Sequence, residues 1–405
     1  MILILTLCIL LALVFYGWKI SQDIFAPFVI TPLVWAFVLF CFLVFPHNLY
    51  PIGEKFAGNL LVWVISFFLS SLVAYQRTSM TSEAAVQVMP NKKVINLYVT
   101  LTIILMPIVI VVTIWTAFIN DPVNMFRYLR VMNTGVDESI EAPDLGVLNY
   151  MVAMAYVTLF FTLLYVKNKW ILGTIIFLNL MLAFITMAKT TFLCVILSSL
   201  YVLYVKEIIK IRHITYGLLF FVLLSLTLQS LRAASSQDEV VAVDSFDFFI
   251  LYILTPIPAF EHFALPFSAV HWGENTFRLF YAIFYALGSD IAPVKTILEF
   301  VYVPVETNTY TVLYPFYKDF GTFGVFFFSA VYGLFYGYLY KKTITGSKFA
   351  LIVYAMLLNY IILQFIGDFI FTNLSMEVQH VFFALLPFLK FKYNGQKSRY
   401  IDGHV

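Results

Sequence analysis

The chain has 405 residues, of which 62% are hydrophobic and only 11% are charged, with a formal net charge of +2. A soluble domain carries about 25% charged residues, so this composition leaves too little polar surface to cover a body that faces water. The apolar residues also form runs of about 20, the length that crosses a bilayer. These properties exclude a soluble enzyme and predict an all-α integral membrane protein, built as one polytopic domain over residues 1–405.

The cysteines give no sign of a disulfide framework or a metal site. Cys8, Cys41 and Cys194 all lie inside apolar runs, and none belongs to a CxxC or Cys/His ligand spacing. The first apolar run has no basic leader and no small-residue cleavage site, so we interpret it as a retained membrane span.

Eleven apolar runs follow one another along the chain, and we predict about 11 transmembrane helices, with 10 to 13 as the range. Backbone polar groups in lipid must be satisfied within the segment, so these runs are expected to be helices rather than open strands. They cover residues 2–18, 28–45, 58–75, 94–118, 148–166, 170–188, 190–206, 214–231, 324–340, 349–367 and 372–389.

The distribution of Lys and Arg predicts the orientation, because cytoplasmic loops are enriched in these residues. With a cytoplasmic C-terminus, the inner segments hold 16 basic residues and the outer segments hold 8. We therefore predict an outer N-terminus and a cytoplasmic C-terminus. Two long segments then fall outside: a first outer loop over 119–147 and a large outer loop region over 232–323.

The large outer region is expected to contain re-entrant or interfacial helices. Residues 246–263 are apolar but carry Pro256 and Pro258, which break a helix interior. Residues 276–288 place phenylalanines at helical spacing on one side, which predicts an amphipathic helix at the membrane interface. Such helices could wall a cavity open to the outer leaflet, or form a plain plug without a ligand.

A polar and aromatic tract follows this region. It begins with Asn308-Thr309-Tyr310-Thr311, continues with Tyr314-Pro315-Phe316-Tyr317-Lys318-Asp319-Phe320-Gly321 and ends at Gly324. The tract resembles that of the bacterial oligosaccharide repeat-unit polymerases, the Wzy-type O-antigen polymerase family, in which Tyr-x-Asp-Phe-Gly-x-x-Gly stands at the start of a helix. Further pieces of the resemblance are Leu129-Arg130 with Asn149-Tyr150, Ala188-Lys189-Thr190, in which Ala188 departs from the usual Gly or Ser, and Arg232.

The resemblance implies a GT-C-like, metal-independent glycosyltransferase that uses no cofactor and no nucleotide sugar. Such enzymes join undecaprenyl-diphosphate-linked oligosaccharide repeats at the periplasmic face of the bacterial inner membrane. The growing glycan leaves its diphosphate carrier and is attached to a new lipid-linked unit. The expected partners are these lipid-linked oligosaccharides, membrane lipid and a chain-length-regulating co-polymerase, and no nucleic acid is expected.

The chemistry requires positive charge, because the diphosphate leaving group gains negative charge as the glycosidic bond breaks. Arginine suits this task since its planar fork pairs with two phosphate oxygens. Arg232 is the favoured diphosphate clamp, and Arg278 is the second candidate for a catalytic cation. The other basic candidates for substrate binding are Arg127, Arg130, Lys189 and Lys318. For each of these, and for Lys295, the alternative is a residue that snorkels to the interface.

The reaction also needs a base for the acceptor hydroxyl, within hydrogen-bond reach of its proton. The candidates are Glu261, His262, His271, Glu274 and Asp319. Asp319 could instead cap a helix, and any single one of them could be structural. Asp368 and Glu377, near the outer ends of the last two helices, could pair with an outer arginine or face water. Tyrosines could stack on sugar rings or belong to an interfacial aromatic belt: Tyr281, Tyr285, Tyr310, Tyr314 and Tyr317.

Two alternative functions remain open at the level of the sequence. An O-antigen ligase, which transfers the glycan to a lipid A core, displaces the same lipid diphosphate. A lipid-linked oligosaccharide flippase or transporter would do no covalent chemistry. Transporters place ionisable residues within their spans and often show inverted repeats, whereas charge here gathers in the outer stretch.

Overall fold

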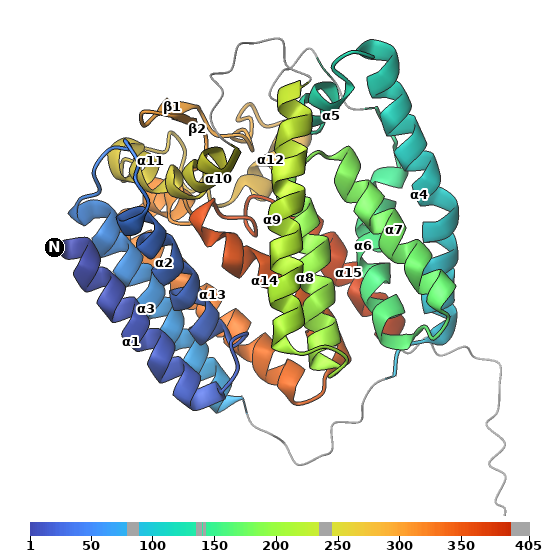
Figure 1. The fold of residues 1–405 in the computed structure, drawn as a ribbon, viewed down its shortest axis with the longest axis horizontal. Helices are drawn as coiled ribbons and strands as arrows, with labels where there is room; N and C mark the ends of the chain where they lie inside the picture. Colours follow the sequence, from blue (N-terminus) through green and yellow to red (C-terminus); the bar gives the residue numbers. More distant parts are fainter. Residues whose placement is uncertain (79–88, 135–139, 141–142, 235–244, 390–405) are drawn as a thin grey trace, which may run out of the picture.

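The computed structural model describes residues 1–78, 89–134, 140, 143–234 and 245–389. The described chain is a bundle of long helices with short helices, loops and one small hairpin gathered at one end (Figure 1). That end carries α5, α10, α11 and α12, which come from the two segments predicted as outer loops. We call it the loop-bearing end.

The elements follow one another in this order. They are α1 (Ile2–Ser21), α2 (Pro27–Val44), α3 (Glu54–Arg77), α4 (Lys92–Asn120), α5 (Met125–Thr134), α6 (Leu148–Tyr165), α7 (Lys169–Ile185), α8 (Lys189–Val205), α9 (Ile211–Ala234), α10 (Ser245–Leu254), α11 (Pro256–Phe263), α12 (Arg278–Ala286), β1 (Val301–Tyr302), β2 (Glu306–Thr307), α13 (Tyr314–Ile344), α14 (Lys348–Ile362), η1 (Leu363–Phe365), α15 (Leu374–Leu385) and η2 (Leu386–Phe388). The strands β1 and β2 pair antiparallel.

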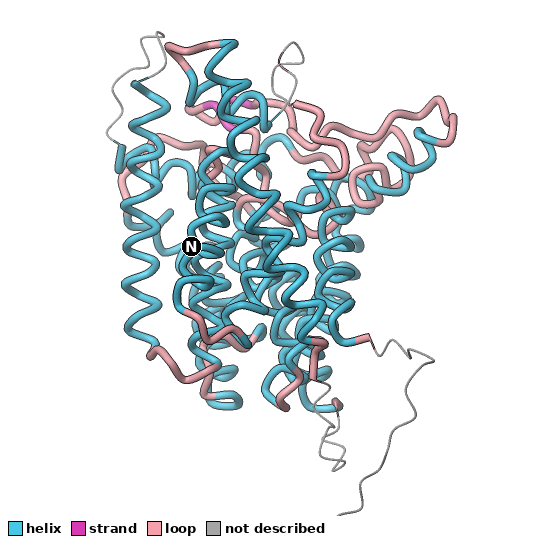
Figure 2. Tube along the Cα trace, turned by 90° about the vertical axis from the view of Figure 1, so that its right-hand side faces the viewer, coloured by secondary structure: helices cyan, strands magenta, loops and turns pink. Residues whose placement is uncertain are grey.

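The helices confirm an all-α membrane protein. Within the described residues, eight helices are long and apolar enough to cross a membrane, and α7, α8 and the α15–η2 segment are shorter apolar helices. Each of the eleven predicted runs corresponds to one of these helices. Figure 2 shows the helices side by side along the bundle, with loops and a short helix that project sideways at the loop-bearing end.

Polar side chains fix where several helices begin. The Asn91 side chain accepts a hydrogen bond from the Lys93 amide at 2.9 Å, and Asn168 accepts one from the Trp170 amide at 2.9 Å. Each satisfies an amide that has no partner within its helix, which is the preferred role of Asn before a helix. These caps explain why α4 and α7 start sharply at basic residues.

The most extensive helix packing among the described residues is between α13 and α3, and it depends on glycines. A Cβ at Gly333 would lie 2.5 Å from the Phe67 carbonyl oxygen, and one at Gly337 would lie 2.2 Å from the Ser71 carbonyl oxygen. Only glycine permits this approach. The four-residue spacing of the two glycines is therefore used for close packing, as is common between membrane helices.

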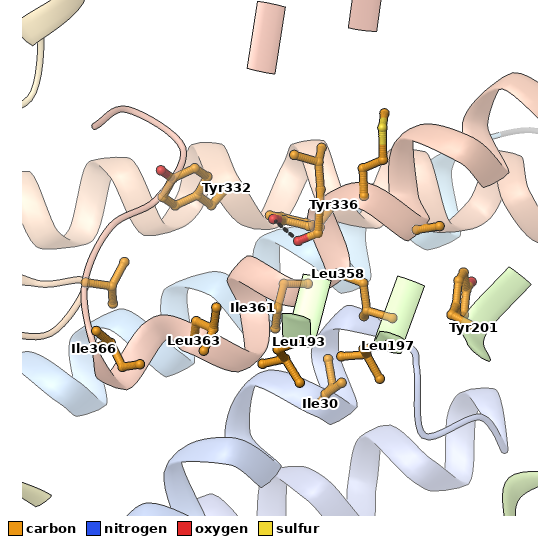
Figure 3. Close-up of a cluster of buried hydrophobic side chains, with 14 of the residues drawn as sticks. Ile30, Leu193, Leu197, Tyr201, Tyr332, Tyr336, Leu358, Ile361, Leu363 and Ile366 are labelled. Atoms are coloured by element: carbon orange, nitrogen blue, oxygen red, sulfur yellow. Dashed lines mark hydrogen bonds between the residues drawn. The ribbon is translucent and has the colours of Figure 1, made fainter. Parts of the chain in front are cut away.

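The interior of the bundle combines aliphatic and aromatic side chains. Figure 3 shows Leu193 and Leu197 of α8 close to Leu358 and Ile361 of α14. Its dashed line marks the hydrogen bond from the Tyr336 hydroxyl to a backbone oxygen of α14, 2.8 Å long. Nearby, the indoles of Trp35 and Trp63 both donate to the Gln364 side-chain oxygen at 3.0 Å. This shared acceptor ties α2 and α3 to η1.

The large loop region contains short helices where a broken helix and an amphipathic helix are predicted. The apolar segment is divided at Thr255 into α10 and α11, because Pro256 cannot continue the hydrogen bonding of α10. On α12, Phe280, Phe284 and the adjoining Leu287 are exposed. An exposed apolar face on a short helix at this end suits contact with the membrane interface.

One boundary differs from the prediction. The apolar run that predicts the ninth helix begins at residue 324, whereas α13 already begins at Tyr314. The first part of α13 is polar and aromatic, so hydropathy does not reveal it. Gly321, with φ 62° and ψ −155°, breaks the helical geometry inside α13 and joins this first part to the long apolar part.

Candidate functional site

A cavity of about 320 Å³ lies at the loop-bearing end and gathers segments that are far apart in the sequence. We call it the cationic cavity, after its basic residues Arg130, Arg278 and Lys295. The side chains that line it include Arg130, Thr190, Tyr252, Asn275, Arg278, Lys295, Asn308, Thr309, Thr311, Tyr314, Asp368, Phe369, Thr372 and Asn373. Both predicted outer loops therefore contribute to one site.

The three basic residues come from three segments. Arg130 belongs to α5, Arg278 is the first residue of α12, and Lys295 lies in the loop that follows α12. Burial lowers the pKa of Arg130, an effect that nearby Tyr252 opposes, and burial also lowers the pKa of Arg278. Arginine stays protonated in proteins even so, so the cavity holds positive charge in partly desolvated surroundings.

A hydrogen bond fixes Arg278 next to the loop that carries Lys295. The Arg278 Nε donates to the Val294 carbonyl oxygen at 2.7 Å, and Val294 immediately precedes Lys295 in the chain. The bond uses one of the five donors of the guanidinium. It therefore orients the planar fork and holds the two cations at neighbouring positions of the wall.

The tract of Asn, Thr and Tyr residues forms another part of the wall. The Thr311 amide donates to the Ile366 carbonyl at 3.2 Å, and Thr311 forms a parallel bridge with Gly367. This pairing places Asn308 and Thr309 beside the connection between η1 and α15. The polar tract and the loop that follows α14 are thereby built into one surface.

Tyr314 lines the cavity, and its neighbours hold it. The Lys318 Nζ donates to the Tyr314 hydroxyl at 3.3 Å. The Tyr310 ring lies 4.5 Å from the Tyr314 ring, centroid to centroid, and the Tyr310 hydroxyl donates to the Glu299 carbonyl at 2.9 Å. Burial raises the pKa of Tyr310. Tyr310 and Lys318 thus support Tyr314 from behind the wall.

Asp368 is the carboxylate that lines the cationic cavity. One of its oxygens accepts a hydrogen bond from the Tyr332 hydroxyl. The other accepts bonds from the amides of Phe371 at 3.0 Å and Thr372 at 3.1 Å. Burial raises the pKa of Asp368, while these hydrogen bonds act in the opposite direction. A fixed, buried carboxylate therefore faces the same space as the basic residues.

The comparison with protein families gives a match over most of the chain. Residues 23–365 match the family model described as Putative O-antigen polymerase. The chain belongs to this family. No curated protein and no solved structure matches the chain in the corresponding comparisons. Membership in the polymerase family indicates a glycosyltransferase-like enzyme of the membrane that acts on lipid-linked oligosaccharide.

The family match includes most of the cavity wall but ends just before Asp368. It contains Arg130, Arg278, Lys295 and Tyr314. Asp368 and the loop that leads to α15 lie outside the matched residues, and they line the cavity because of how the chain folds. Among the described residues, no group of three or more His, Cys, Asp or Glu side chains is arranged to hold a metal ion.

The Asp-Phe-Gly part of the polymerase tract supports the site from outside the wall. Asp319 is buried, and its carboxylate accepts hydrogen bonds from the Asn275 side chain and the Thr276 amide, both at 2.7 Å. Those residues lead into α12, which begins with Arg278. Gly321 has a backbone conformation that only glycine adopts readily. The contacts of Asp319 thus position Arg278 and do not place Asp319 itself at the cavity.

Glu261 and His262 lie at a different place and hold α11 to the start of α3. The Glu261 carboxylate accepts a hydrogen bond from the Phe56 amide at 2.6 Å, in the first turn of α3. His262 is exposed, and its Nε2 lies 2.8 Å from the Pro51 carbonyl oxygen. Neither residue lines the cationic cavity, so the structure does not bring these two base candidates to the basic residues.

The remaining candidates surround the cavity or lie apart from it. The Lys189 Nζ lies 5.3 Å from the centroid of the Tyr252 ring, which lines the cavity. Arg127 is exposed on α5. Tyr317 is buried with its ring 5.2 Å from that of Phe260. Arg232 falls in the last turn of α9, and its side chain lies outside the described residues.

Two residues of the wall, Lys295 and Asp368, are not predicted as catalytic or substrate-binding residues from the sequence. The sequence around Lys295 is that of an interfacial lysine, and nothing in it shows that Arg278 is hydrogen-bonded to Val294, the preceding residue. Asp368 interrupts two apolar stretches near the end of a span, and an ionisable residue at such a place is a functional candidate. That signal alone could have given Asp368 more weight.

Proposed function

We propose that this protein polymerises undecaprenyl-diphosphate-linked oligosaccharide repeats at the periplasmic face of a bacterial inner membrane. The observation that carries the proposal is the convergence of Arg130, Arg278 and Lys295 on one cavity with Tyr314 and Asp368. Three cations suit a diphosphate, and a carboxylate beside them suits proton transfer. The family supports the polymerase chemistry, and a GT-C-like arrangement is part of the proposal.

In this proposal the basic residues stabilise the departing diphosphate. An acceptor hydroxyl oxygen attacks the anomeric carbon of the donor glycan and forms the new glycosidic bond. The bond from that carbon to the diphosphate oxygen breaks, and its electron pair stays on the diphosphate. Preorganised cations in a partly desolvated site favour that growing charge. Arg278 supplies a guanidinium whose orientation is fixed by the Val294 carbonyl.

Asp368 is the proposed base for the acceptor hydroxyl. It takes the hydroxyl proton as the new bond forms, which balances the reaction together with the departing diphosphate. A general base works best when its pKa approaches the operating pH, and burial raises the pKa of Asp368 toward that range. Tyr314, held by Lys318 and Tyr310, offers a ring face against which a sugar can pack.

The proposed orientation places the loop-bearing end outside, with the N-terminus out and the C-terminus in the cytoplasm. Its support is the bias of Lys and Arg toward the opposite segments. Elements of both predicted outer loops lie at the same end of the bundle (Figure 1). A reporter fused within residues 264–300 should be active only in the periplasm, and cytoplasmic activity would overturn the orientation.

The test of the function is a polymerisation assay with purified protein and a lipid-linked repeat. We expect a ladder of glycans on the lipid carrier, and we expect Arg130→Ala and Lys295→Ala to abolish it at unchanged membrane abundance. Arg212→Ala, at the start of α9 and exposed, is the matched control. Transfer only to a lipid A core would indicate a ligase. Movement of single repeats across the membrane without elongation would indicate a flippase.

A further inference from the structure

A second cavity, of about 240 Å³, lies within the helices beside the cationic cavity. Residues of α6, α7, α8, α14, η1 and α15 line it, and most of its surface is carbon. Leu182, Val195, Leu363, Phe369 and Met376 are among its lining residues. We call it the apolar cavity.

The two cavities share part of their walls. Thr190, Phe369 and Asn373 line both of them. Thr190 lies in the first turn of α8, and the other two residues lie in the connection between η1 and α15. The apolar cavity therefore adjoins the charged site, with these three residues between them, and extends along α7 and α8.

The ionisable residues of this region are bonded to one another. Glu377 and His380 of α15 are buried, so Glu377 does not face water. The Tyr360 hydroxyl donates to the Glu377 carboxylate at 2.6 Å, and the His380 Nδ1 lies 3.4 Å from its other oxygen. Such pairing is how membrane helices accommodate ionisable groups, and it leaves an apolar ligand compatible with this cavity.

We propose that the apolar cavity binds the isoprenoid chain of the donor lipid, at the units nearest the diphosphate. This inference rests on the proposed function and adds the site at which the protein binds the lipid chain of the donor. A cationic site that adjoins a carbon-lined cavity fits a ligand with an anionic head and one apolar chain. Burial of that chain is favourable in proportion to the area it covers.

The occupant is a single isoprenoid chain and not a phospholipid of the bilayer. Three basic residues exceed the needs of one phosphate but suit a diphosphate. The charged site adjoins one carbon-lined cavity of about 240 Å³, whereas a phospholipid would need room for two chains. The shared walls at Thr190 and Phe369 supply the continuity between head and chain.

The test fills the apolar cavity and varies the lipid. Ala183 on α7 is fully buried and lines the cavity, so Ala183→Leu places extra side-chain volume inside it. The control is Gly173→Leu on the same helix, where a Cβ meets nothing within 4 Å. Each protein is assayed with a donor carrying the full undecaprenyl chain and with one carrying a single isoprene unit on the same diphosphate and glycan.

We expect the unaltered protein and Gly173→Leu to prefer the long-chain donor in kcat/KM. Ala183→Leu should lower kcat/KM for that donor about tenfold, the change that about 1.4 kcal/mol produces, while the short-chain donor is affected little. Equal loss with both donors, or no loss, would overturn the lipid assignment and leave the polymerase function standing. Absence of elongation by the unaltered protein would instead refute the proposed function.

A second measurement does not depend on the folding of a variant. A polyprenyl diphosphate with a diazirine on its second isoprene unit is photolysed with the unaltered protein. Crosslinks mapped by mass spectrometry to α7, α8 and α15 are expected, and an excess of unlabelled polyprenyl diphosphate should suppress them. Crosslinks confined to the outer surface of α1 or α4 would contradict the proposal.

If Ala183→Leu does not accumulate, Ala153→Leu on α6 fills the same cavity and replaces it in the assay with the two donors.

Discussion

Arg278 illustrates how one residue can combine charge, orientation and position. Its Nε is bonded to a backbone carbonyl, so the side chain enters the cavity with its plane already fixed. A preorganised donor of this kind loses little freedom when the leaving group gains charge. At the scale of the residue, catalysis therefore depends on geometry as well as on positive charge.

The first prediction separates these two contributions. Arg278→Ala should lower kcat about 10²–10³-fold, the usual effect of removing one preorganised donor. Arg278→Lys keeps the charge but lacks the planar fork. Its activity should therefore fall between that of Arg278→Ala and that of the unaltered protein. The measurement is single-turnover elongation at saturating donor. Equal activity of the Lys variant and the unaltered protein would mean that charge alone suffices.

The second prediction concerns the pH dependence that Asp368 confers. The base must be unprotonated, so activity should rise as the pH increases through the pKa of Asp368, which burial raises. Asp368→Asn should lower kcat about 10²–10⁴-fold, and its residual rate should lack this rise. The pH profile of kcat/KM checks the sign. An unchanged acidic limb in Asp368→Asn would assign the base to another residue.

At the scale of the element, α13 is two helical pieces joined at Gly321. The first piece contacts the loop that precedes α12. The Ser268 amide of that loop donates to the Lys318 carbonyl at 3.0 Å, just before the break. Phe267 packs so closely that a Cβ at Gly321 would lie 2.8 Å from its ring. The kink therefore couples the first part of α13 to the loop that precedes Arg278.

The third prediction tests this coupling. Gly321→Ala should destabilise the protein by about 1–3 kcal/mol, because φ 62° and ψ −155° are strained for any residue with a side chain. Its control is Gly58→Ala within α3, where a Cβ meets nothing within 4 Å and alanine favours the helix. Thermal unfolding in detergent should show a lower Tm for the first variant only. Equal Tm values would mean that the break is not required.

At the scale of the whole molecule, the sequence predicts the bundle well and the site only in part. Hydropathy identifies the helices because it measures what lipid requires of a span. Hydropathy does not identify the start of α13 at Tyr314, because the first part of that helix is polar and aromatic. The cavity escapes it as well, because Arg130, Lys295 and Asp368 are brought together only by the packing of distant segments.

The same limit explains which candidates the structure separates. Glu261 and His262 are adjacent to an apolar break and look suited to catalysis, yet their hydrogen bonds hold α11 to α3. Asp319 belongs to the tract that carries the family resemblance, but its bonds fix the residues before α12. A sequence tract can belong to a site because it holds the lining residues in place. The sequence does not distinguish such residues from those that contact the substrate.

The account depends on basic side chains of the cationic cavity holding a polyprenyl diphosphate. The most direct measurement is the Kd of undecaprenyl diphosphate for the purified protein and for Arg130→Ala, Arg278→Ala and Lys295→Ala, with Arg212→Ala as control. Each cavity variant should raise Kd at least about tenfold, since a hydrogen bond to a charged group contributes about 1.5–3 kcal/mol. Equal Kd values for all five proteins would contradict the account.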